Sequence, residues 1–230
     1  MHVLALAKTK GGVGSTTLAA CLAVEASRHH KRVGILDCDP QRSLERWWHT
    51  RAGEAQLGLD DRRLELVEHE RHLDDTLAKA RDGKFDVLII DGPPGNIDVT
   101  SLIIEAADFI LIASQPSPLD VGAMDAVVDV ARESGKPYAF ILTRTKPNAV
   151  ATPEAGDFLS TLGEVLKDPK SGALLEIGDR TGYSAAMLRG ATLPEVEPKG
   201  KAPAEIAKLW DTIDAKLRRA AKAAAKARVA

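Results

Sequence analysis

Short hydrophobic runs alternate along the chain with longer segments in which apolar residues recur with a helical period. Most runs are too short for helices, are rich in Val, Ile and Leu, and show little alternation between polar and apolar positions. Parallel strands that are buried on both faces have this pattern. We therefore predict strands at residues 2–7, 32–39, 63–69, 85–91, 109–114 and 138–143, with a weaker candidate at 173–177.

The segments between the predicted strands have the pattern of crossover helices. We predict such helices at residues 16–30, 43–51, 73–81, 121–134 and 153–166. Strands that alternate with helices in this way form a mostly parallel, twisted sheet with helices on both faces. The predicted fold class is therefore α/β, and the 230 residues fit a single domain, 1–230.

The last long segment, residues 202–230, reads as one helix. Its apolar stripe consists of Ile206, Leu209, Trp210, Ile213 and Leu217, and the stripe stops at Leu217. We therefore predict a basic C-terminal helix at about residues 203–228 that packs on the domain through these side chains.

Composition excludes several classes of protein. The formal net charge is −2, so overall charge does not point to nucleic acid. Cys21 and Cys38 are the only cysteines, which is too few for a disulfide framework, and neither they nor the histidines have the spacing of metal ligands. We expect a protein of the reducing cytoplasm. No apolar run is long enough to span a bilayer.

A glycine-rich loop follows the first predicted strand and leads into the first predicted helix. Gly11, Gly12 and Gly14 lie in this loop. Glycines at such a place let backbone N–H groups converge on an anion at a helix N-terminus. Thr16 lies where a hydroxyl binds Mg²⁺ in a phosphate-binding loop. The alternative is a tight turn that needs glycine for its backbone conformation alone.

Three carboxylates lie at the ends of predicted strands. Asp37 and Asp39 end the second strand, and Asp91 ends the run 85–91. Ligands bind at the carboxyl edge of sheets of this kind, and a buried carboxylate needs a partner such as hydrated Mg²⁺. Each Asp alone is explained equally well as a helix or turn cap. Their joint occurrence beside a glycine loop favours a metal and phosphate site.

Four segments together resemble the ParA/MinD family of P-loop ATPases. They are KGGVGSTT (10–17), DCDPQ (37–41), IIDGPPG (89–95) and SQPSPLD (114–120). The resemblance covers about residues 2–215 and is greatest to small ParA partition proteins that lack an N-terminal DNA-binding domain. It implies a P-loop NTPase fold and the partition of plasmid or chromosomal DNA.

The resemblance also implies cofactors and partners. They are ATP or ADP with Mg²⁺, a second copy of the chain in a homodimer that sandwiches ATP, and double-stranded DNA bound without sequence preference. A ParB-like centromere-binding protein would stimulate hydrolysis. The implied location is cytoplasmic and nucleoid-associated, with no membrane.

Site residues follow from the same resemblance. Lys10 matches the signature lysine that reaches the phosphates of the partner subunit, and Asp39 matches the carboxylate that positions the attacking water. Thr16 matches the direct Mg²⁺ ligand, and Asp37 and Asp91 match residues that act on Mg²⁺ through water.

The implied nucleotide-binding set is larger. Besides Lys10 and Thr16 it contains Gly11, Gly12, Val13, Gly14 and Ser15 in the loop, Thr17 at the α-phosphate, and Thr143 and Arg144 near the base. The match at Thr143 and Arg144 is loose, and Lys10 has the alternative of a solvated loop lysine.

Ser15 departs from the family pattern, which has a second lysine at this position. Loss of a charge-assisted hydrogen bond to phosphate costs about 1.5–3 kcal/mol. This corresponds to about one to two orders of magnitude in affinity, and the loss in the hydrolysis transition state is potentially larger. Ser15 is either an engineered substitution or a natural divergence. Lys8 lies two residues before Lys10, and side chains two apart along a strand point in the same direction. Lys8 is therefore a conceivable replacement for the missing loop lysine.

We therefore expect an ATPase whose hydrolysis Ser15 impairs. The alternative is a non-catalytic, nucleotide-responsive protein of the ParA type that has a DNA-binding or regulatory role.

Basic residues gather toward the end of the C-terminal helix. They are Lys216, Arg218, Arg219, Lys222, Lys226 and Arg228, with Arg189 as a separate candidate. One interpretation is a helix end that complements the helix dipole. The other is a non-specific DNA contact, which the resemblance favours. Membrane anchoring is disfavoured because large apolar residues are almost absent after Leu217.

Overall fold

One parallel sheet forms the centre of the protein. The computed structural model describes residues 1–29, 31–53, 63–117 and 124–227. The strands are β1 (His2–Ala7), β2 (Val33–Asp37), β3 (Leu64–Leu66), β4 (Val87–Asp91), β5 (Phe109–Ser114), β6 (Tyr138–Thr145), β7 (Glu164–Val165) and β8 (Glu176–Gly178). Their order is β3-β2-β4-β1-β5-β6-β7, and β8 also pairs with β6. All these pairings are parallel, as the sequence predicts.

The central strands are buried on both faces. Every residue of β2, β4 and β5 is buried. Their side chains enter two hydrophobic clusters, one on each side of the sheet. This explains why the sequence shows continuous apolar runs instead of alternation.

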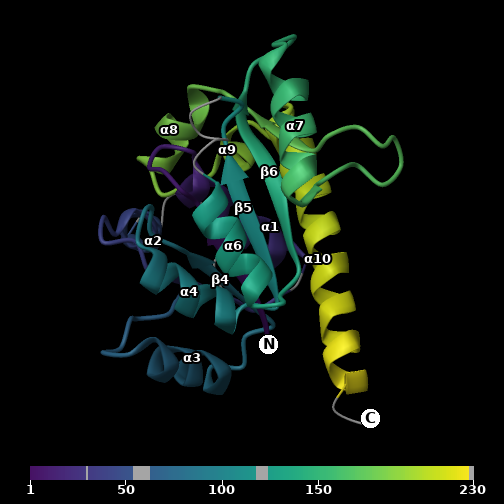
Figure 1. Cartoon of the computed structure of the whole chain (residues 1–230). Helices are drawn as coiled ribbons and strands as arrows, with labels where there is room; N and C mark the ends of the chain where they lie inside the picture. The colour runs from purple at the N-terminus through teal and green to yellow at the C-terminus, as the bar shows by residue number, and fades with distance from the viewer. Residues whose placement is uncertain (30, 54–62, 118–123, 228–230) are drawn as a thin grey trace.

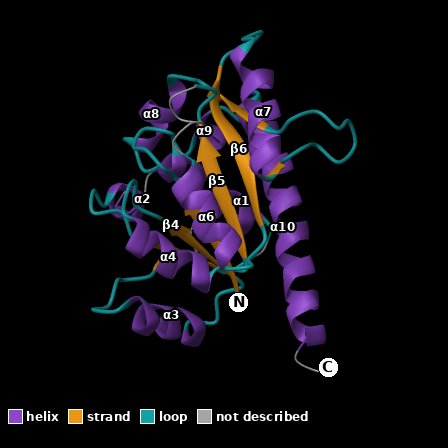
Figure 2. Cartoon of the chain, in the orientation of Figure 1, coloured by secondary structure: helices purple, strands orange, loops and turns teal. Residues whose placement is uncertain are grey.

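Helices cover both faces of the sheet (Figures 1 and 2). One cluster contains side chains of α1 (Ser15–Arg28), α2 (Ser43–Gly53) and α10 (Ala202–Ala227). The other contains side chains of α3 (Leu73–Asp82), α4 (Ile97–Ala106), α6 (Asp125–Glu133) and α7 (Ala151–Leu162). Two short helices, α8 (Gly182–Met187) and α9 (Leu193–Val196), lie between β8 and α10 along the chain.

The C-terminal helix packs on the sheet as predicted. The side chains of Ile206, Leu209, Trp210, Ile213 and Leu217 are all buried in the cluster that also contains α1. Past Leu217 the helix continues to Ala227 without further buried apolar side chains among the residues whose burial is described. The apolar stripe predicted from the sequence is therefore the buried face of this helix.

Several elements differ from the prediction, including β3, which is shorter than the predicted strand 63–69, and helices α4, α8 and α9, which were not predicted. The predicted helix 153–166 is wrong at its end, because α7 stops at Leu162 and residues 164–165 form β7. The ring of Tyr138 lies against Gly163, and its hydroxyl donates to the carbonyl of Leu162 at 2.7 Å, which favours the end of the helix there.

Two further differences concern β8 and α4. The weak strand predicted at 173–177 begins only at Glu176. Helix α4 was not predicted, because Ile97–Ala106 is rich in β-branched residues, which favour strands.

Replacement of Trp210 by alanine tests the packing of α10. Trp210 is fully buried, so we expect Trp210→Ala to lower the free energy of unfolding by about 3–5 kcal/mol. Urea unfolding followed by circular dichroism measures this loss. As a control, Leu188 is 83% exposed, and Leu188→Ala should change stability by less than about 0.5 kcal/mol. Equal losses in both variants would contradict the packing of α10.

Candidate functional site

The glycine loop joins the carboxyl end of β1 to the N-terminus of α1. Gly12 and Gly14 have φ angles of +83° and +82°, which L side chains rarely adopt. No heavy atom lies within 4 Å of a Cβ placed on Gly11, Gly12 or Gly14, so the backbone of the loop faces open space. Helix α1 has neither a side-chain cap nor an acidic residue in its first turn. Its N-terminal N–H groups are therefore available to an anion.

Asp91 lies at the centre of the sheet edge beside this loop. In the strand register it is opposite Leu6 of β1 on one side and Asp37 of β2 on the other. Its carboxylate is fully buried and accepts hydrogen bonds from Ser15 Oγ at 3.0 Å and Thr16 Oγ1 at 2.5 Å. The structure thus brings the predicted Mg²⁺ residues Thr16 and Asp91 together, and it adds Ser15 to them.

Asp37 acts as a cap in this structure. One of its oxygens accepts from the backbone N–H of Asp39 at 3.0 Å. The other accepts from the N–H groups of Leu44 at 2.8 Å and Glu45 at 3.0 Å, in the first turn of α2. The capping alternative therefore holds for Asp37, and contact with Mg²⁺ through water stays a prediction.

Lys8 occupies the space between Asp39 and Asp91. Its Nζ lies 3.0 Å from Asp39 Oδ2 and 3.3 Å from Asp91 Oδ1, and the side chain is only 4% exposed. Strand parity suggested a direction for Lys8, but it did not predict these two contacts. The available signal was a lysine directly after the apolar run Val3–Ala7, where a buried charge needs a partner.

The local environment shifts the pKa values of two carboxyl groups in opposite directions. Burial raises the pKa of Asp91 above its usual range, against the opposing effects of Lys8 and the Thr16 and Ser15 hydroxyls. Burial also acts to raise the pKa of Asp39, but the backbone N–H of Gln41 and the Lys8 ammonium outweigh it, so this pKa is lowered. Asp39 is therefore a charged carboxylate at neutral pH.

Cys38, between Asp37 and Asp39, has a thiol whose pKa is raised by its surroundings. Burial raises the pKa of its thiol to about 12, and the negative charges of Asp37 and Asp91 add to this shift. The thiolate, which is the nucleophilic form, is therefore essentially absent at neutral pH.

The oxygen donors at this edge fit a magnesium ion. Hydroxyl and carboxylate oxygens, as in Thr16 and Asp91, are the protein ligands that Mg²⁺ prefers, and the ion keeps several waters or phosphate oxygens. Within the described part of the chain, no group of three or more His, Cys, Asp or Glu side chains is arranged to hold a metal.

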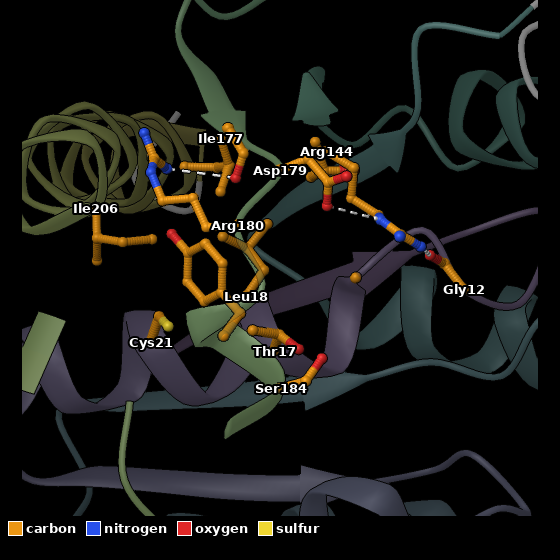
Figure 3. A pocket seen from close by; sticks show the side chains of 14 residues that line it. Gly12, Thr17, Leu18, Cys21, Arg144, Ile177, Asp179, Arg180, Ser184 and Ile206 are labelled. Atoms are coloured by element: carbon orange, nitrogen blue, oxygen red, sulfur yellow. Dashed lines mark hydrogen bonds and ion pairs between the residues drawn. The ribbon is translucent and has the colours of Figure 1, made fainter. Parts of the chain in front are cut away.

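A cavity of about 280 Å³ lies beside the loop, on the side of β6 and β8 (Figure 3). Its walls include Thr17, Arg144 and Tyr183. Thr143 Oγ1 donates to the carbonyl of Val13 at 2.6 Å. The two predicted base-region residues, Thr143 and Arg144, therefore lie at this cavity together with Thr17.

Arg144 connects the cavity to the loop. Its guanidinium donates to the carbonyl of Gly12 at 3.1 Å and to Asp179 at 3.3 Å, so it lies between the two in Figure 3. Asp179, Arg180 and Tyr183, which also line the cavity, were not predicted. No sequence motif distinguishes these three residues from ordinary loop and helix positions.

The remaining predicted site residues are more scattered. Lys10 is half-buried at the loop. Lys216 donates to Glu164 at 2.6 Å, and Arg218 pairs with Asp214 at 2.6 Å. The exposed basic side chains on α10 are Arg218, Arg219, Lys222 and Lys226. Arg228 and residues 118–120 of the predicted SQPSPLD motif lie outside the described residues.

Arg189 does not share a surface with the basic end of α10. It is exposed and follows α8, which lies at the opposite end of the molecule from the C-terminal end of α10 (Figure 1).

Among the helices in the described ranges, none combines the length and apolar character needed to cross a bilayer.

Comparison with known proteins identifies relatives over most of the chain. The family described as "VirC1 protein" matches residues 1–134. Maintenance of carboxysome distribution protein A of Gloeobacter kilaueensis is 34% identical over 169 residues, which cover 71% of each chain. The protein of the same name from Halothiobacillus neapolitanus is 26% identical over 211 residues, or 88% of this chain and 91% of that protein. Protein ParA of Rhizobium radiobacter is 28% identical over 209 residues, or 86% and 88%.

Solved structures share the fold. The MinD cell division protein of Aquifex aeolicus has a TM-score of 0.74 at 20% identity, over 94% of this chain and 98% of that one. A plasmid partition protein of Borrelia burgdorferi bound to AMPPNP has a TM-score of 0.70 at 19% identity, over 94% and 99%. The curated relatives, the matched family and this shared fold agree, and the chain therefore belongs to the ParA/MinD family of P-loop ATPases.

Proposed function

We propose that this protein is a ParA-type partition ATPase that binds MgATP at residues 10–17, dimerises around the nucleotide and binds duplex DNA without sequence preference. The observation that carries the proposal is the open glycine loop with Thr16 and Asp91 in contact beside it. Phosphates would lie against the loop backbone and the N-terminus of α1, where N–H groups are available to an anion.

The adjoining cavity supports a nucleotide as the ligand. It begins at Gly12 and Gly14 and extends to Thr143 and Arg144, so it continues from the phosphate loop. We propose that the nucleoside occupies this cavity, with Thr17 near the α-phosphate. Among proteins of this fold, the Borrelia burgdorferi partition protein was solved with AMPPNP and Pyrococcus horikoshii MinD with Mg-ADP.

Slow hydrolysis is the second part of the proposal. Position 15 has no positive charge, and the Ser15 hydroxyl donates to Asp91 instead of facing the loop opening. Negative charge that develops on the phosphate oxygens during hydrolysis would therefore lack the stabilisation that a loop lysine gives. Asp39, which we propose positions the attacking water, is held by Lys8.

The contacts of Lys8 with Asp39 and Asp91 also favour a second candidate function. In that case the protein responds to nucleotide without useful turnover and acts as a DNA-binding or regulatory protein. Multiple-turnover phosphate release with MgATP separates the two functions, because only the ATPase exceeds one phosphate per chain.

The cargo and partners follow from the family. Relatives are named for carboxysome distribution and for ParA, which supports partition or positioning as the cellular role. We propose a homodimer with Lys10 of each subunit at the phosphates of the other, and a ParB-like protein as the activator of hydrolysis. The exposed cations at the end of α10 are the proposed DNA contact.

Restoring the loop lysine tests the proposal on hydrolysis. We expect Ser15→Lys to raise the steady-state rate of ATP hydrolysis by about tenfold or more, because the new charge stabilises the transition state. Phosphate release under multiple turnover measures the rate. Ser15→Ala, which removes only the hydroxyl, should not raise it. Equal rates for the parent and Ser15→Lys would contradict impairment by Ser15.

Neutralising the basic end of α10 tests the DNA contact. We expect the triple variant Arg218→Gln, Arg219→Gln, Lys222→Gln to bind duplex DNA more weakly with MgATP. The slope of log K against log salt should become shallower by about 2–3, since each lost phosphate contact contributes about 0.9. Fluorescence anisotropy of a labelled duplex over a salt series measures both quantities.

A matched control removes the same charge at another surface. Arg71, Arg81 and Lys84 are exposed near α3, and their replacement by glutamine should leave the salt slope unchanged. If the two triple variants bind DNA equally, α10 is not the contact.

A further inference from the structure

Lys8 and Ser15 both donate a hydrogen bond to the same carboxylate oxygen of Asp91. Asp91 Oδ1 accepts from Lys8 Nζ at 3.3 Å and from Ser15 Oγ at 3.0 Å. Lys8 follows the end of β1 and Ser15 begins α1, so the loop between them brings both ends to the same carboxylate. A positive charge at Lys8 therefore lies beside position 15, where the loop has a neutral serine.

The balance of buried charge makes Lys8 necessary at this edge. Asp37, Asp39 and Asp91 are all buried beside the loop. Of the lysines in the described ranges, Lys8 is the one that is buried, and it pairs with two of these three carboxylates. Without it, a triphosphate that enters the loop would approach three buried carboxylates, and repulsion between like charges is strong where water is excluded.

The buried position of Lys8 costs free energy of folding unless its positive charge interacts with negative groups. Burial of an ammonium group is unfavourable, and buried ion pairs are often no better for stability than apolar residues of similar volume. Asp37 has three backbone donors of its own and needs no lysine. The charge of Lys8 therefore serves the two carboxylates that it contacts, Asp39 and Asp91, both of which are buried beside the loop.

We propose that Lys8 supplies the positive charge that the phosphate-binding loop lacks at Ser15, so that nucleotide affinity depends on Lys8 instead of a loop lysine. The inference rests on the proposed function, since it presumes a nucleotide at this loop. The inference concerns the affinity for nucleotide, whereas the proposed slow hydrolysis concerns the transition state of the reaction. Lys8 is held by Asp39 and Asp91 and does not lie in the loop, so it replaces the missing lysine in charge and not in position.

A charge-exchange experiment tests this inference. The probe is a non-hydrolysable ATP analogue with a fluorescent ribose label, titrated with magnesium present. We expect Lys8→Met to weaken its affinity about 10- to 100-fold, as for the loss of a charge-assisted contact. The double variant Lys8→Met, Ser15→Lys should recover most of the affinity, because a charge returns beside Asp91. No hydrolysis is needed for this measurement.

Two controls separate binding from folding and from charge in general. Lys136 is half-buried and donates to the carbonyl of Ala107 at 2.9 Å, before β6 begins and so away from the loop, and Lys136→Met should bind the analogue as the parent does. Urea unfolding of each variant shows whether it is folded. An affinity loss in folded Lys8→Met that Ser15→Lys does not recover would overturn the inference, because the charge would then not be exchangeable.

The outcomes also distinguish this inference from the proposed function. If the parent and Ser15→Lys both fail to bind the analogue, the proposed nucleotide site is wrong, and the role of Lys8 falls with it. If the parent binds and Lys8→Met binds equally well, only the role of Lys8 is wrong. When the titration of the parent protein is repeated in EDTA, which removes magnesium, the analogue should bind more weakly. Equal affinity with and without magnesium would mean that the ammonium takes the place of the metal ion, which would overturn the inference as stated.

Discussion

The carboxylate of Asp91, buried at the middle of the sheet edge, is the group on which the site depends. It accepts from Lys8, Ser15 and Thr16, which belong to the end of β1 and the first turn of α1. A buried charge must be paired and hydrogen-bonded, so this one group fixes the relative positions of the strand, the loop and the helix. The open backbone of the glycine loop is held beside the acidic edge as a consequence.

Under the proposed function, the same arrangement would separate two tasks that one loop lysine usually combines. A cation at Lys8 offsets the buried carboxylates, but it is anchored by Asp39 and Asp91. A cation within the loop would instead lie against the phosphates themselves, where charge develops during hydrolysis. If the proposals on Lys8 and Ser15 hold, nucleotide binding and hydrolysis depend on different side chains of this site.

The architecture could be predicted to a large extent, and its errors have local causes. β2, β4 and β5 were found because burial on both faces leaves continuous apolar runs. Helix α4 was missed because its β-branched residues resemble those of a strand. β7 was taken for the end of a helix, since a strand of only two residues has no period and depends on its neighbour β6.

By itself the sequence determined the glycine loop, the strand-end carboxylates and the apolar stripe of α10, because these features are fixed by local spacing along one element. Tertiary structure decided which of them meet. Lys8 contacts Asp91 across a separation of 83 residues, and Thr143 contacts Val13 across 130. Such contacts follow from the strand order β2-β4-β1-β5-β6, which local periodicity does not encode. The walls of the cavity at Asp179, Arg180 and Tyr183 arise in the same way, from β8 beside β6, and no motif marks them in the chain.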